Sequence, residues 1–222
     1  MNEIIQAIAV YALPVIFAIT LHEAAHAYAA KYFGDNTAYS QGRMSLNPMR
    51  HIDPFGTLIL PALLYITSKS MGYPMLLGYA KPVPVDYSRL RNPKKQMAFV
   101  ALAGPAANFV MAIGWIVFGI IITQMHVSEL YPYKVAQAGM LTNMVMFVFN
   151  LLPIPPLDGS RVAFALLPHR LAATYAKLEP YGMFIVLGLL LTHLLDYWFN
   201  PMMALTQTLL HWTVSPLTLL LS

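Results

Sequence analysis

The stretch IFAITLHEAAHAYAAKY, residues 16–32, decides the fold, because it combines a membrane-spanning helix with three functional candidates. His22, Glu23 and His26 lie inside an apolar run, where a titratable side chain costs several kcal/mol. The HExxH spacing puts both histidines on one helix face, so their imidazoles can share one metal ion, with Glu23 beside them. Chance occurrence of the motif, or a histidine pair satisfied by backbone carbonyls, is the alternative interpretation.

Composition places the chain outside the range of soluble domains. It is 58% hydrophobic and 10% charged, with a mean hydropathy of +0.59. We therefore expect an all-α polytopic membrane protein with about five or six transmembrane helices. We treat 1–222 as one domain, with a core at 1–170 and C-terminal helices at 178–222. There are no cysteines, so any metal must be held by histidine and carboxylate. The net charge of +4 does not imply nucleic-acid binding.

The distribution of lysine and arginine gives the predicted orientation. Glu3 alone precedes the first apolar helix, whereas Lys31, Arg43 and Arg50 follow HExxH. The positive-inside rule then places the HExxH end towards the cytoplasm, in a multi-pass protein of the cell membrane. Arg43 and Arg50 are interpreted as solvated interface charges. The predicted spans are 2–33, 97–125, 137–152 and 179–199, and the apolar tail 201–222 is either a fifth span or an interfacial helix.

Between the first two spans, residues 52–85 are short for a crossing and rich in proline and glycine. We expect a re-entrant unit in which LLGYAKPVPV, residues 76–85, returns as an extended edge strand able to pair with a peptide. Pro82 and Pro84 exclude a helix there. An ordinary proline-rich cytoplasmic loop is an equally good interpretation of the spacing.

Two further motifs lie on later spans. AGPAAN, residues 103–108, has small residues suited to close helix packing, which is the default interpretation of Gly104 and Pro105. Asn108 is a buried amide that needs partners and is a candidate for orienting a substrate backbone or a neighbouring helix. NLLPIPPLDG, residues 150–159, begins at the end of the third span, and its prolines predict an extended, stiff backbone.

Asp158, within the last of these motifs, is the candidate third metal ligand, because it is expected at the same membrane depth as His22 and His26. The alternative is a plain helix N-cap, a role that aspartate fills often.

HEAAH, AGPAAN and NLLPIPPLDG, in this order and on successive helices, resemble the site-2 protease family of intramembrane zinc metalloproteases. The resemblance covers about residues 1–170, and the chain looks like the compact subgroup that lacks a PDZ or nucleotide-sensing domain. It implies one Zn²⁺ per chain, held by His22, His26 and Asp158, with Glu23 as general base. It also implies the substrate-positioning residues Asn150, Gly78, Tyr79, Ala80 and Lys81. Asn108, suggested above by its own chemistry, is a further candidate for this role.

The resemblance also implies an activity and partners. We expect an endopeptidase that cleaves transmembrane segments of membrane proteins near the cytoplasmic leaflet of the bilayer. Whether it forms a homo-oligomer is left open. Two rival functions remain from the residues alone: a metal transporter with a midplane His–His–Asp site, and a catalytically silent scaffold that binds metal.

Overall fold

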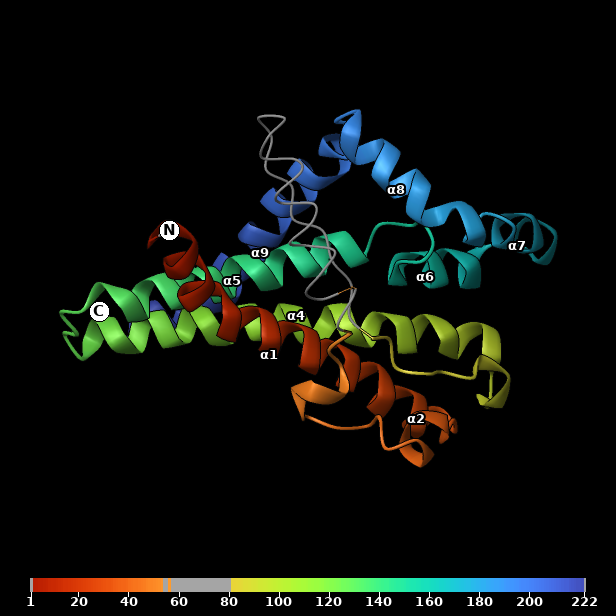
Figure 1. The fold of residues 1–222 in the computed structure, drawn as a ribbon, viewed down its shortest axis with the longest axis horizontal. Helices are drawn as coiled ribbons and strands as arrows, with labels where there is room; N and C mark the ends of the chain where they lie inside the picture. Colours follow the sequence, from red (N-terminus) through yellow and green to blue (C-terminus); the bar gives the residue numbers. More distant parts are fainter. Residues whose placement is uncertain (1, 54–55, 57–80, 222) are drawn as a thin grey trace.

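The computed structural model describes residues 2–53, 56 and 81–221 (Figure 1). These residues form helices and irregular segments, and the described part of the chain contains no strand. The elements are α1 (Asn2–Phe33), α2 (Thr37–Ser40), η1 (Pro48–Arg50), η3 (Tyr87–Arg89), α4 (Pro93–Gln124), α5 (Leu130–Asn150), α6 (Asp158–Leu166), α7 (His169–Ala176), η4 (Glu179–Tyr181), α8 (Gly182–Leu191) and α9 (Asp196–Leu221).

Three long helices, α1, α4 and α5, pack against one another and form the core of the molecule. Figure 1 shows α9 beside α5 and the shorter α6, α7 and α8 at one end of the bundle. Helix α9 contacts α4 and α5, and α6 contacts α4. The first, second and third predicted spans therefore correspond to the three core helices.

Among the described residues, two helices are long and apolar enough to cross a membrane. They are Ile5–Phe33 and Pro93–Gln124, whose most apolar windows have mean hydropathies of 1.9 and 2.1. In the same part of the chain, a third span results only if His169–Leu191 and Asp196–Thr218, which meet at 85°, count as one broken crossing. The helical fold class is confirmed, whereas a total of five or six spans stays a prediction.

Helix α1 matches its predicted span, whereas α4 and α5 start earlier than predicted. Helix α1 covers the predicted first span, and α4 starts at Pro93, where a proline without an amide hydrogen suits a first helical position. Helix α5 starts at Leu130. The helix therefore starts before residue 137, where the third span was predicted to begin.

The predicted fourth span, 179–199, is wrong as a single helix. Helix α8 ends at Leu191 and α9 starts at Asp196. Between them His193 adopts a left-handed backbone conformation with φ of 56°, which interrupts the helical hydrogen-bond pattern. No glycine or proline marks residues 192–195, so the sequence carried no breaker signal.

The prediction for the proline-rich segment before α6 is also wrong. Residues 151–157 form successive turns and bends instead of an extended backbone. The Ile154 amide donates to the Leu152 carbonyl and the Leu157 amide to that of Ile154, at 2.8 and 3.0 Å. These local bonds bring the chain sharply from α5 into α6.

The loop after α1 is anchored by a buried aspartate. Asp35 is fully buried, and its carboxylate accepts the amide hydrogens of Thr37 and Asp86 at 2.9 and 2.8 Å. The first contact starts α2, and the second ties the segment before η3 to the end of α1. Most of the re-entrant unit predicted for 52–85 lies outside the described residues and stays a prediction.

Candidate metal centre

The two histidines of HExxH lie on the buried face of α1. Small residues line this face, since Ala18, Ala24, Ala27 and Ala30 are all almost inaccessible. They let α4 approach α1 closely, as small residues do between membrane helices. His22 and His26 are 5% and 9% exposed, so their imidazoles are held in the α1–α4 interface.

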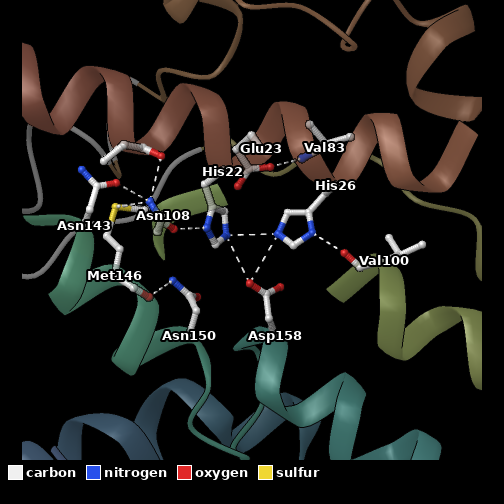
Figure 2. Close-up of polar contacts among 11 residues, drawn as sticks. His22, Glu23, His26, Val83, Val100, Asn108, Asn143, Met146, Asn150 and Asp158 are labelled. Carbon is white, nitrogen blue, oxygen red and sulfur yellow. Dashed lines mark hydrogen bonds and ion pairs between the residues drawn. The ribbon is translucent and has the colours of Figure 1, made fainter. Parts of the chain in front are cut away.

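Helix α4 presents three positions, four residues apart, to these imidazoles. His26 Nδ1 donates to the Val100 carbonyl at 2.7 Å, and His22 Nδ1 donates to Asn108 Oδ1 at 2.6 Å (Figure 2). Gly104 lies between them. A Cβ on Gly104 would overlap His26 Nε2 and lie 2.7 Å from His22 Cε1. Only glycine leaves room for both rings, which is more specific than the packing role predicted from sequence.

Asn108 is oriented by a third helix. It is fully buried, and its Nδ2 donates to Asn143 Oδ1 on α5 at 2.9 Å and to the Ala18 carbonyl at 3.3 Å. Asn143 Nδ2 in turn donates to the Gly139 carbonyl at 2.9 Å. The Asn108 oxygen is therefore directed at His22. These contacts to neighbouring helices fit one of the two roles that the sequence suggested for Asn108, and its contact with substrate stays a prediction.

The hydrogen bonds fix the histidine tautomers. An amide oxygen and a carbonyl can only accept, so both Nδ1 atoms carry the hydrogen and, in neutral imidazoles, both Nε2 atoms are bare. The two Nε2 atoms lie 3.0 Å apart. Since neither can then donate to the other, two lone pairs face each other across this distance.

Asp158 completes the cluster from α6. Its Oδ2 lies 3.1 Å from His22 Nε2 and 3.4 Å from His26 Nε2. This oxygen is buried and receives no hydrogen bond from the described residues. The N-cap alternative does not hold, because Leu157 occupies the cap position of α6 and the cap makes no side-chain bond. Gly159 lets α6 start against the end of α5, since a Cβ there would lie 2.6 Å from the Leu152 carbonyl oxygen.

This donor set fits a zinc ion. Two imidazole nitrogens and a carboxylate oxygen are zinc ligands, and ligands at tetrahedral zinc lie about 3.3 Å from one another. The three observed separations are 3.0, 3.1 and 3.4 Å. Without a cation or added protons, three lone-pair atoms at these distances repel. Three protein ligands would leave a fourth position open, as in catalytic zinc sites.

Glu23 lies next to the cluster and is half-buried. Its Oε2 accepts the backbone amide hydrogen of Val83 at 2.7 Å (Figure 2). Val83 belongs to the described end of the predicted edge strand. Residues 81–85 lie along α1 without regular secondary structure, whereas Gly78, Tyr79 and Ala80 lie outside the described residues.

Two other predicted substrate-positioning residues are described. Lys81 uses both backbone groups internally, since its amide donates to the His51 carbonyl at 2.9 Å and its carbonyl accepts from Arg43 at 2.9 Å. Asn150 ends α5, and its Nδ2 donates to the Met146 carbonyl at 3.0 Å. Their contact with substrate stays a prediction.

Charged and aromatic groups border the cluster on the α6 side. Arg161 forms an ion pair with Glu179 and lies 5.7 Å from the centre of the Tyr87 ring. Burial raises the pKa of the Tyr87 phenol; the Arg161 guanidinium opposes this shift, and the carboxylates of Asp158 and Glu179 add to it.

Sequence reasoning missed two residues near the site. Arg43 is half-buried, its Nη2 donates to two carbonyls, and its Nε is buried, so its interpretation as a solvated charge is wrong. Asn143 was not singled out at all. A lone asparagine within an apolar helix is a signal that could have found it, because a buried amide needs a partner.

Comparisons with known proteins agree with this chemistry. Residues 119–193, which include Asp158, match Peptidase family M50. "Putative zinc metalloprotease YwhC" of Bacillus subtilis is 35% identical over 200 residues, covering 86% of this chain and 84% of that protein. "Putative zinc metalloprotease Rip2" of Mycolicibacterium smegmatis is 35% identical, and that of Mycobacterium tuberculosis H37Rv 30% identical, each over 83% of this chain and 67% of the relative.

No solved structure gives a significant match. The family assignment therefore rests on sequence alone, and the geometry above is independent of it. With YwhC covered over most of its length, the relationship extends well beyond the three short motifs. The chain belongs to peptidase family M50, the site-2 protease family of zinc metalloproteases.

Proposed function

We propose that the chain is an intramembrane zinc endopeptidase that cleaves transmembrane segments of other membrane proteins near the cytoplasmic leaflet. One zinc ion per chain is held by His22, His26 and Asp158. The observation that carries the proposal is the convergence of three acceptor atoms, 3.0–3.4 Å apart, with no donor between them in the described structure.

Zinc, when bound, supplies Lewis-acid chemistry that acidifies water and polarises a peptide carbonyl. The protein's own groups supply the rest. Glu23 takes the proton of the attacking water and returns it to the leaving amine as general base and then general acid. Asn108 and the Val100 carbonyl keep both Nε2 lone pairs directed at the ligand position.

Membrane placement supports this substrate class. The cluster lies on the second half of α1, a helix apolar enough to span a membrane, and basic residues follow this end of the helix. By the positive-inside rule the site opens towards the cytoplasmic side of the cell membrane. A substrate helix must unwind there, because helical hydrogen bonds otherwise shield its peptide bonds. Residues 76–85 are proposed to pair with the unwound substrate segment.

The test replaces Glu23 by glutamine in the purified, reconstituted protein with a model transmembrane substrate. We expect Glu23→Gln to reduce cleavage by about a hundredfold or more, since general acid–base catalysis contributes on this scale. Zinc content should equal that of the wild type, because Glu23 is outside the ligand set. Glu129→Gln, the same change at an exposed position, should cleave normally. Undiminished cleavage by Glu23→Gln would overturn the proposal.

A further inference from the structure

The carboxylate of Glu23 is held by a backbone group from a distant part of the chain. The amide of Val83 donates to Oε2 at 2.7 Å, a hydrogen bond strengthened by the charge of the acceptor. A backbone donor cannot rotate as a side chain can. It therefore fixes one carboxylate oxygen and with it the direction of the other, Oε1.

The flanking residues make Val83 the sole donor at this point. Pro82 and Pro84 have no amide hydrogen, so within 82–84 only the Val83 amide can reach Glu23. Its side chain is buried against Ala27 of α1 and Ala38 of α2. The segment is therefore seated against the same helix that carries Glu23.

A bracket formed by Arg43 and His51 keeps the segment in place. Arg43 Nη2 donates to the carbonyls of Lys81 and Pro82 at 2.9 and 3.3 Å, and the His51 carbonyl accepts the Lys81 amide at 2.9 Å. His51 is fully buried, and its ring Nε2 lies 2.7 Å from the Ser45 carbonyl. These bonds leave the Val83 amide little freedom to move away from Glu23.

We propose that the Val83 backbone amide positions the general base and that Arg43 positions Val83. This inference rests on the proposed function, since it assigns a task to the groups around Glu23. With Oε2 bound, the carboxylate keeps one orientation and Oε1 is available for proton transfer. Loss of the donor lets the flexible glutamate side chain sample unproductive orientations, and misplacement of a reacting group lowers the rate of the chemical step.

The decisive comparison is Val83→Pro against Val83→Ala. Both variants lose the isopropyl group, but only the first loses the amide hydrogen. We expect kcat of Val83→Pro to be at least about tenfold below that of Val83→Ala, with KM within about twofold and equal zinc content. A role limited to folding or substrate binding would instead change stability, zinc content or KM. Equal kcat values for the two variants would overturn the inference.

Arg43 provides a second test that does not alter the segment itself. Arg43→Gln removes the donor to both carbonyls and should lower kcat by about tenfold at unchanged KM and zinc content. Arg170→Gln makes the same change at an exposed side chain on α7 and should leave kcat unchanged. If Val83→Pro does not fold, this pair decides the question, and a wild-type kcat for Arg43→Gln contradicts the proposal.

The two proposals fail differently. If Glu23→Gln cleaves as well as the wild type, Glu23 is not the general base and the proposed function fails. If Glu23→Gln is inactive while Val83→Pro matches Val83→Ala and Arg43→Gln matches the wild type, only the positioning role is wrong.

Discussion

Gly104 sets the distance between the two histidines and the helix behind them. Both imidazoles lie where a side chain at this position would start, and a single methyl group there would overlap His26 Nε2. The rings are also held by the Val100 carbonyl and Asn108, so they cannot swing aside without losing the bonds that fix their tautomers. The site therefore requires a residue without a side chain at position 104, as well as the side chains that form the cluster.

We predict that Gly104→Ala lowers zinc affinity by about tenfold or more, in the range expected when the support of a metal ligand is disturbed. Zinc per chain, measured by elemental analysis after dialysis against buffered zinc, is the readout. Gly114→Ala is the matched control on the same helix, because a Cβ there meets nothing within 4 Å. Full zinc content in Gly104→Ala would contradict this account of the α1–α4 contact.

For individual residues, the sequence indicated the metal-binding cluster but not the residues that hold it in place. HExxH and Asp158 could be recognised because their residue types carry metal chemistry, and Asp158 was distinguished by its expected depth and by the family resemblance of the motif that contains it. The tasks of Gly104, Asn143 and Arg43 depend on contacts between distant segments. No spacing along the chain reveals that Asn108 faces His22, or that Arg43 reaches the carbonyls of Lys81 and Pro82.

Helix α6 is the element that delivers the carboxylate, and both its ends are fixed. Its start at Gly159 lies against the carbonyls of Leu151 and Leu152. Beyond its end, Lys94 Nζ of α4 donates to the Leu167 carbonyl at 2.6 Å, a favourable place for a cation because helix carbonyls are unpaired there. A short helix held at both ends can keep Asp158 in place.

We predict that Lys94→Met destabilises the protein by about 2 kcal/mol, because a partly buried, charged hydrogen bond is lost. The apparent Tm in detergent should fall, measured with zinc removed so that metal binding does not mask the effect. Lys95→Met, the same change at an exposed neighbour, should leave Tm within about 1 °C, as is usual for surface changes. Equal melting of the two variants would show that the Lys94 contact contributes nothing.

Elements were predicted well where apolar runs are long and poorly where the chain turns. The extent of α1 follows from its hydropathy and from Gly34 after its end, whereas α4 starts at Pro93, before the predicted residue 97. The α8–α9 break has no such mark, because His193 rather than glycine takes the left-handed conformation. The turns between α5 and α6 depend on local hydrogen bonds, which a proline-rich sequence does not predict.

In the molecule as a whole, the candidate zinc site connects α1 with α6, two helices that pack little against each other. The histidines belong to α1 and the carboxylate to α6, whereas the main packing of α6 is against α4. A bound ion would link α1 to α6 directly. Such a link stabilises the folded state in proportion to the logarithm of zinc concentration over its dissociation constant.

We predict that removal of zinc by a chelator lowers the apparent Tm by about 5 °C or more, from the roughly 2.7 kcal/mol that a ligand at a hundredfold excess over its Kd contributes. Differential scanning fluorimetry with and without zinc measures the shift. Asp158→Ala should show no zinc-dependent shift, and Glu23→Gln should show the full one. A zinc-dependent shift that survives Asp158→Ala would mean that another group is the third ligand.

The wide separation of the cluster along the chain has a consequence for biosynthesis. His22 and His26 leave the ribosome early and enter the membrane with the first helix, whereas Asp158 follows only after α4 and α5. Until that residue has been made and α6 has folded back, the three atoms cannot meet. A nascent chain therefore cannot form this centre until the core is complete.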